Sequence, residues 1–244
     1  MSMGGWWNRQ ARKHSDSDFK AMRAEKNSRK KPKAPVDSVY RYFDREEYAE
    51  AFARGEVFIS TLKRCREYED PLQGDKEEAY EHYNSGRAVT GDGSDPDFVA
   101  FAAKCGVRVA EGARGITIVD NTMTTYLADA FVLCTTLGFV NDLSESFGKY
   151  CVKISSVDKF ARALTVSLNA KYKLAQSAHG MVSYQGRHYK ELENSPGLLG
   201  FVKPADPYAP QREYRFLWTA LDPTEIKGCV VLCPEISQYV TRVK

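Results

Sequence analysis

Hydrophobic and polar residues alternate in two short segments in the first quarter of the chain. Residues 38–43 (SVYRYF) and 56–61 (EVFIST) show this alternation, which is typical of strands because successive side chains point to opposite faces. Residues 44–55 lie between them, with Asp44 and a glutamate three residues later placed as a capping box and Gly55 placed as a stop signal. The pattern therefore predicts a strand, a helix and a second strand in succession.

The rest of the chain predicts more strands than helices. Apolar residues recur at helical spacing over 157–168, and a further helix is expected at 75–84. Further strands are expected at 115–119, 131–136, 149–154, 181–186, 211–219 and 228–233. Runs of strands with few helices favour an α+β fold over a regular alternation of strands and helices.

The predicted strand at 211–219 begins QREYRFLW and has two unlike faces. Its aromatic residues share one face, on which they can pack against a core: Tyr214, Phe216 and Trp218. Glu213 and Arg215 share the other face, and the same period places Gln211 beside Glu213. Such a charged face is either exposed to water or lines a cleft, and the pattern alone leaves both open.

Length and composition are those of a globular protein. The 244 residues suffice for one large domain or two small ones. No apolar run reaches the roughly 18 residues of a membrane helix, and the N-terminal residues lack the apolar core of a signal peptide, so a cytoplasmic protein without membrane contact is predicted. The six cysteines lack the paired spacing of zinc ligands, and we expect them to be buried and reduced.

Positive charge is concentrated at the N-terminus. Residues 1–35 contain ten Lys or Arg and three acidic residues, whereas the whole chain has a net charge of only +3. The remainder is thus net negative, and the sequence predicts a flexible basic arm and linker before a folded domain at 36–244. Such an arm either binds phosphates or an acidic partner or is a solvated tail, and Trp6 and Trp7 favour a binding role.

Two strand positions are candidates for ligand contacts. Arg41 has the same parity as Val39 and Phe43, which should face the core. Its charge then needs an anionic partner or a polar cleft, and a salt bridge at the edge of the sheet is the alternative. Residues 134–136 (CTT) end another predicted strand, where hydroxyl groups can hold a sugar or phosphate or serve as ordinary sheet residues.

An acidic segment at 70–82 offers a candidate metal site. Glu78 and His82 lie four residues apart and would share one face of the helix expected there. Only one histidine lies in the segment and no known ligand spacing is present, so a solvated acidic face is favoured and no metal is predicted. His179 and His188 flank a predicted strand without an evident acid–base partner.

The order of these motifs resembles the arginine–serine–glutamate class of ADP-ribosyltransferases. VYRYFD is similar to the opening strand of those enzymes, CTT to their Ser-Thr-Ser strand, and QREYR to their Q-x-E strand. Over most of 36–244 the chain also resembles uncharacterised bacterial proteins thought to share this fold, some of them in toxin–antitoxin and phage-defence systems. The resemblance implies an ADP-ribosyltransferase-like split β-sheet with flanking helices, NAD as co-substrate and no metal.

The resemblance also implies roles for individual residues. Glu213 would be the catalytic glutamate, because an ionised carboxylate beside the ribose stabilises an oxocarbenium-like transition state. Gln211 would help to choose the acceptor, and Arg215 would brace Glu213. Contacts to NAD are implied for Arg41, Tyr42, Ser60, Thr135 and Thr136.

Cys134 departs from the family pattern, because the family has a serine at the corresponding position. The hydroxyl contact there is missing or moved, and Ser60 of FIST is the alternative match. In the family, Q-x-E accompanies modification of amide side chains or nucleobases. With the basic arm, we therefore expect a nucleic-acid acceptor, RNA rather than DNA. An enzyme of this kind that stays in its own cell also implies a protein antitoxin.

Three other functions remain open on the sequence. The same fold without activity would serve as a nucleic-acid- or partner-binding module, which the basic arm and Cys134 favour. An NAD-degrading enzyme would release nicotinamide without transferring ADP-ribose. A metal-dependent hydrolase would use the acidic residues of 70–82.

Overall fold

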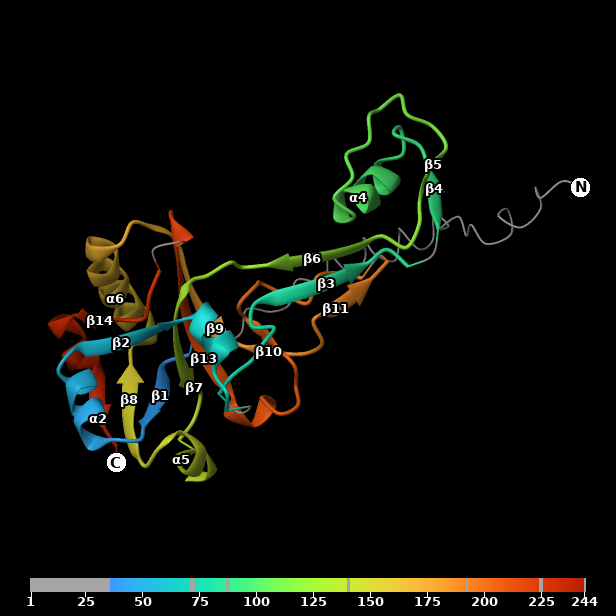
Figure 1. The fold of residues 1–244 in the computed structure, drawn as a ribbon. Helices are drawn as coiled ribbons and strands as arrows, with labels where there is room; N and C mark the ends of the chain where they lie inside the picture. The colour runs from blue at the N-terminus through green and yellow to red at the C-terminus, as the bar shows by residue number, and fades with distance from the viewer. Residues whose placement is uncertain are drawn as a thin grey trace, which may run out of the picture. The chain divides into compact units, whose positions relative to one another are not determined.

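The computed structural model describes residues 36–243 apart from 71–72, 87, 140, 192 and 224–225. The predicted arm at 1–35 lies outside the described residues. Contacts in the described chain form two compact units (Figure 1). The larger unit comprises residues 36–80, 126–186 and 197–243, and the smaller unit comprises residues 81–125 and 187–196. The smaller unit is thus encoded by two segments that interrupt the larger one.

An eight-stranded sheet is the framework of the larger unit. Six strands follow the order β14-β2-β7-β1-β8-β15, while β13 pairs with β7 and β9 pairs with β13. The strands are β1 (Ser38–Phe43), β2 (Glu56–Thr61), β7 (Phe131–Thr136), β8 (Tyr150–Ser155), β9 (Leu174–Met181), β13 (Glu213–Ala220), β14 (Cys229–Leu232) and β15 (Val240–Arg242). This mostly antiparallel sheet, with five helices among the described residues, confirms the predicted α+β class.

The sheet is split beside β7. Strand β13 pairs with the whole length of β7, from Phe131 to Thr136. Strands β1 and β2 must therefore share the other edge of β7, where β2 pairs with Phe131 and Val132 and β1 pairs with Thr136. On that edge, residues 133–135 lie between the two strands with neither as a partner.

Helices cover one face of this sheet and bury its main core. Helices α2 (Glu46–Ala53) and α6 (Val157–Lys171) contribute Phe52, Phe160 and Leu164 to a cluster that includes Phe216 and Trp218. The predicted helix at 157–168 is confirmed, and the aromatic face of β13 is buried as its alternation predicts.

A second cluster packs against the opposite face. Val132 and Leu217 from the sheet contact Leu62, the first residue of helix α3 (Leu62–Glu67), and Phe201. A short parallel pair, β10 (Ser183–Tyr184) with β12 (Val202–Lys203), lies in the same unit, as do α5 (Asn141–Phe147) and the 3-10 helices η2 (Ala209–Gln211) and η4 (Pro234–Tyr239). None of the described helices has the length and apolar character needed to cross a membrane.

The smaller unit has a separate core. It contains the three-stranded sheet β11-β3-β6, the pair β4-β5 and helix α4, which Asp95 caps through its side chain. Tyr83, Phe98, Phe101 and Ile118 pack together in this core. The element bounds are β3 (Tyr80–Asn84), β4 (Val89–Gly91), α4 (Pro96–Lys104), β5 (Ile116–Ile118), β6 (Thr122–Tyr126) and β11 (His188–Lys190).

Two local predictions are wrong. The helix expected at 75–84 is replaced by turns and by β3, because β3 gains backbone partners on both sides from distant segments of the chain. Asp44 does not cap α2, which begins one residue later with Arg45 as its N-cap and without a side-chain cap bond. Gly55 does follow the helix end, with a φ of +95° that favours glycine.

Candidate functional site

Four charged side chains form a buried ion cluster in the larger unit: Glu78, Lys203, Glu213 and Arg215. Arg215 Nε donates to Glu213 Oε1 at 2.7 Å, and Arg215 Nη1 donates to Glu78 Oε1 at 2.7 Å. Lys203 Nζ lies 3.1 Å from Glu213 Oε2 and 3.5 Å from Glu78 Oε2. Each residue is at most 4% exposed, so water screens these interactions little. The prediction that Arg215 braces Glu213 is confirmed.

Charges within the ion cluster keep Glu213 ionised. Burial by itself would raise the pKa of its carboxyl group, but Arg215 and Lys203 hold that pKa well below its usual value. Burial would likewise lower the pKa of Lys203, but Glu213 and Glu78 raise it above its usual value. A carboxylate whose pKa lies this far below neutral pH has no proton to donate and is a weak base. Within the ion cluster, this negative charge stabilises the positive charges of Arg215 and Lys203.

Two neutral groups also contact Glu213. The Glu213 backbone N–H donates to the Tyr184 hydroxyl at 2.6 Å, and the Cys134 thiol hydrogen-bonds to the Glu213 side chain. Burial raises the pKa of Cys134 well above its usual value and that of Cys65 to about 11, so both thiols stay protonated. All six cysteines are unpaired, as the sequence predicts.

A buried hydroxyl lies next to Glu213 at the end of β7. The register places Thr136 directly opposite both Glu213 on β13 and Tyr40 on β1, so the three side chains share one face of the sheet. Thr136 is 6% exposed, and its Oγ1 has no hydrogen-bond partner in the described part of the chain. This hydroxyl is free to bond a ligand or an ordered water.

Aromatic rings and a guanidinium group lie near that hydroxyl. Tyr40 and Tyr42 contact Phe139 with ring centroids 6.2 and 6.0 Å apart, and the Tyr42 ring is stacked on Phe139. An atom in the Cβ position of Gly138 would lie 3.3 Å from Arg212 Nη1, which places this cation at the same loop. Apolar rings with a few convergent polar groups are typical of a small-molecule site.

Replacing Thr136 by valine is expected to leave the larger unit folded with a free energy of unfolding within about 1 kcal/mol of the wild type. The hydroxyl makes no bond that the change would break, and an apolar group of the same shape removes an unsatisfied buried oxygen. Urea unfolding measures this. Thr135→Val is the contrasting variant, because Thr135 Oγ1 donates to Tyr214 O at 2.7 Å. A loss above 2 kcal/mol (about 30-fold in the folding equilibrium) for Thr136→Val would show that this hydroxyl is already bonded.

Arg41 does not join Glu213. Its neighbour Tyr40 shares the face of Glu213, so Arg41 starts from the opposite face. Its Nη1 donates to the Cys134 carbonyl oxygen at 2.6 Å, within the split of the sheet, and its guanidinium lies over the Phe52 ring. Burial lowers its pKa, and its Nε is buried without a hydrogen-bond partner among the described residues.

The other two residues expected to contact NAD, Thr135 on β7 and Ser60 on β2, lie on opposite faces of the sheet. Thr135 has the parity of the aromatic core, where its hydroxyl bonds Tyr214 O. Ser60 pairs with Val132, so it shares the face of Thr136 but lies four residues away along β7, roughly 13 Å at the rise of a strand. The structure thus groups Glu213, Thr136 and Tyr42 and leaves Thr135 and Ser60 outside this group.

Gln211 does not lie beside Glu213 on a strand. It ends the 3-10 helix η2, and Arg212 follows in a left-handed conformation with a φ of +46°. Strand β13 begins only at Glu213. The alternation that the sequence suggests for these residues is therefore interrupted at Arg212.

The sequence pattern does not identify the partners of Glu213. The sequence offers Glu78 with His82 as a candidate metal site, but Glu78 belongs to the ion cluster and no helix joins the two residues. Lys203 gives no signal in the sequence, since its short strand β12 has only two residues. The only signal in the sequence is the charged face of the 211–219 segment, which is either exposed to water or lines a cleft.

Comparison with known proteins gives no relative. The chain matches no protein family, no curated protein and no solved structure.

Proposed function

We propose that the larger unit is an NAD-dependent ADP-ribosyltransferase of the toxin type in which Glu213 stabilises the transferred ribosyl group. The observation that carries the proposal is the position of this ionised carboxylate, directly opposite the buried and unbonded Thr136 hydroxyl at the split end of the sheet. The nearby rings of Tyr42 and Phe139 would hold the nicotinamide or adenine ring. The order of the motifs along the chain supports the same assignment.

The proposed reaction needs no acid or base from Glu213. The bond between the ribose C1′ and the nicotinamide nitrogen breaks, and nicotinamide leaves with the bonding electrons. Glu213 stabilises the positive charge that develops on the ribose, and Thr136 Oγ1 bonds a ribose hydroxyl. A nucleophilic atom of the acceptor then attacks C1′ and loses its proton to water. In this proposal Arg41 holds the split of the sheet, rather than the NAD phosphates.

We further propose a nucleic acid as the acceptor, RNA rather than DNA. The basic residues of 1–35 would attract phosphates, and Arg212 lies at the loop beside the site. A toxin of this type requires a protein antitoxin as its partner in the producing cell.

A non-enzymatic binding module is the second candidate. Arg215 and Lys203 offset the charges of Glu213 and Glu78, so the ion cluster has no net formal charge. Such a cluster can serve the fold alone, and a carboxylate offset in this way stabilises a nearby cation less.

Incubation of the full chain with labelled NAD and a cell extract tests the proposal. We expect release of nicotinamide and label in the RNA fraction, with no label in the DNA and protein fractions. Label in one of those other fractions would keep the transferase and correct the acceptor. Nicotinamide without label would indicate an NAD-degrading enzyme. No nicotinamide and no label would favour the binding module.

A further inference from the structure

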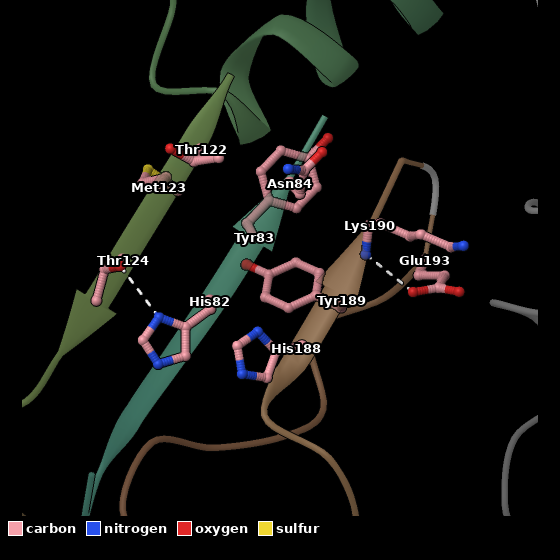
Figure 2. A pocket seen from close by; sticks show the side chains of 10 residues that line it. All are labelled: His82, Tyr83, Asn84, Thr122, Met123, Thr124, His188, Tyr189, Lys190 and Glu193. Carbon is pink, nitrogen blue, oxygen red and sulfur yellow. Dashed lines mark hydrogen bonds between the residues drawn. The ribbon is translucent and has the colours of Figure 1, made fainter. Parts of the chain in front are cut away.

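Two histidines are stacked on neighbouring strands of the smaller unit. His82 on β3 and His188 on β11 are direct partners in a parallel pair, so their side chains share one face of the sheet. Their ring centroids lie 4.6 Å apart with an interplanar angle of 18°. Figure 2 shows the two imidazole rings side by side, each projecting from its own strand.

A cavity of about 610 Å³ opens beside these rings. Its lining includes both histidines together with Thr124, Asn84 and Lys190. His188 is exposed, so a solute can reach its imidazole. His82 is half-buried and its Nε2 atom is itself buried. The volume lies within the range of ligand-binding pockets.

The spacing of the imidazole nitrogens suits a metal ion. One nitrogen of His82 and one of His188 lie within 4.8 Å of each other. Two nitrogens bound to a tetrahedral zinc at about 2.0–2.1 Å are separated by about 3.3 Å. Because the two rings are nearly parallel, their lone pairs lie in separate planes. One ion therefore binds both rings only after the His188 ring turns, which the exposure of this side chain permits.

Thr124 orients one of the rings. Its Oγ1 lies 3.1 Å from His82 Nδ1, a dashed contact in Figure 2. When Nδ1 carries the proton and donates to this oxygen, the lone pair is on Nε2. Fixing a tautomer in this way is the usual function of a hydrogen bond to a metal-binding histidine.

We propose that His82 and His188 bind a divalent transition-metal ion of the type that imidazole prefers, Zn²⁺ or Ni²⁺. The remaining coordination positions face the cavity and are filled by water or by a small ligand with oxygen donors. This site lies in the smaller unit and is independent of the function proposed for the larger one.

Histidine ring signals in a ¹H–¹⁵N spectrum of the full chain test the proposal directly, because the protein has only four histidines. Titration with Zn²⁺ is expected to shift the ring signals of His82 and His188 and to leave those of His179 in place. Calorimetric titration with Ni²⁺ is expected to show one site whose affinity falls at least tenfold in His82→Ala and in His188→Ala. Thr124→Val should lower the affinity for Ni²⁺ about tenfold.

His179→Ala is the matched control, since it removes an imidazole from the larger unit, where His179 Nδ1 contacts the Tyr214 hydroxyl. Its affinity for Ni²⁺ should equal that of the wild type. Circular dichroism shows whether each variant is folded, and the exposed His188 is the safer position for the test. No binding by the wild type, or equal binding by His188→Ala, overturns the proposal.

Discussion

Replacing Arg215 by methionine is expected to lower the free energy of unfolding by about 3–5 kcal/mol. The change leaves the buried carboxylates of Glu213 and Glu78 with Lys203 as the only cation of the ion cluster. The cost comes from the unpaired buried charges, because an intact buried ion pair contributes little net stability by itself. Urea unfolding followed by circular dichroism measures the loss.

Arg54→Met is the control for the loss of a guanidinium group. Arg54 contacts Glu50 and Glu56 at the surface, with 61% of its side chain exposed, so its removal should cost less than about 1 kcal/mol. A second variant isolates the charge: adding Glu78→Gln to Arg215→Met leaves Lys203 paired with Glu213 and should recover part of the loss. Equal losses for Arg54→Met and Arg215→Met would contradict the role of the ion cluster.

The alternation of residues 213–218 predicts which side chains of strand β13 share a face. The aromatic parity predicts a buried face, and Phe216 and Trp218 lie in the main core. The same parity places Glu213 and Arg215 together, where they are hydrogen-bonded. Period two is a local property of the strand, so the sharing of a face is accessible to sequence reasoning, and the contact between Glu213 and Arg215 depends on no distant segment.

The rest of the ion cluster could not be predicted in this way. Glu78 and Lys203 come from segments far from Glu213 in the sequence, and only the tertiary fold brings them together. An acidic segment with Glu78 is typical of a solvated surface, and a lone lysine such as Lys203 is rarely buried. Their burial becomes understandable once Arg215 lies between Glu78 and Glu213 and Lys203 contacts both carboxylates.

Backbone conformation limited the other predictions. Gln211 is two residues from Glu213, but a single left-handed residue, Arg212, removes the strand period between them. Strand β9 was not predicted before Met181, because LAQSAHGM has few large apolar residues. It forms because β13 supplies a partner for nearly every one of its residues.

The parity of Arg41 was predicted, but the reason for its position was not. Its side chain starts from the core face, and the split of the sheet gives it a backbone carbonyl instead of an anion. No sequence pattern shows that two strands will share one edge of β7. The resemblance places Arg41 and Glu213 in one cleft, whereas the two side chains start from opposite faces of the sheet. The role of Glu213 is therefore tested by itself, with a matched pair of glutamate variants.

Glu213→Gln is expected to lower NAD turnover about 100-fold or more, because it removes the negative charge that stabilises the ribosyl cation. Glu78→Gln is the matched control: both glutamates are buried and both bond Arg215 and Lys203. Only Glu213 faces Thr136 at the end of β7. The two variants should lose similar stability, and Glu78→Gln should keep most of the turnover.

The comparison separates catalysis from folding. Nicotinamide release is measured for both variants under conditions in which circular dichroism shows them folded, so that a loss of activity is not a loss of structure. Turnover that falls equally in both variants would mean that Glu213 acts only through the ion cluster. Turnover unchanged in Glu213→Gln would remove this residue from the reaction. A selective loss in Glu213→Gln requires a carboxylate at this position and cannot arise from the balance of buried charge, which both variants change equally.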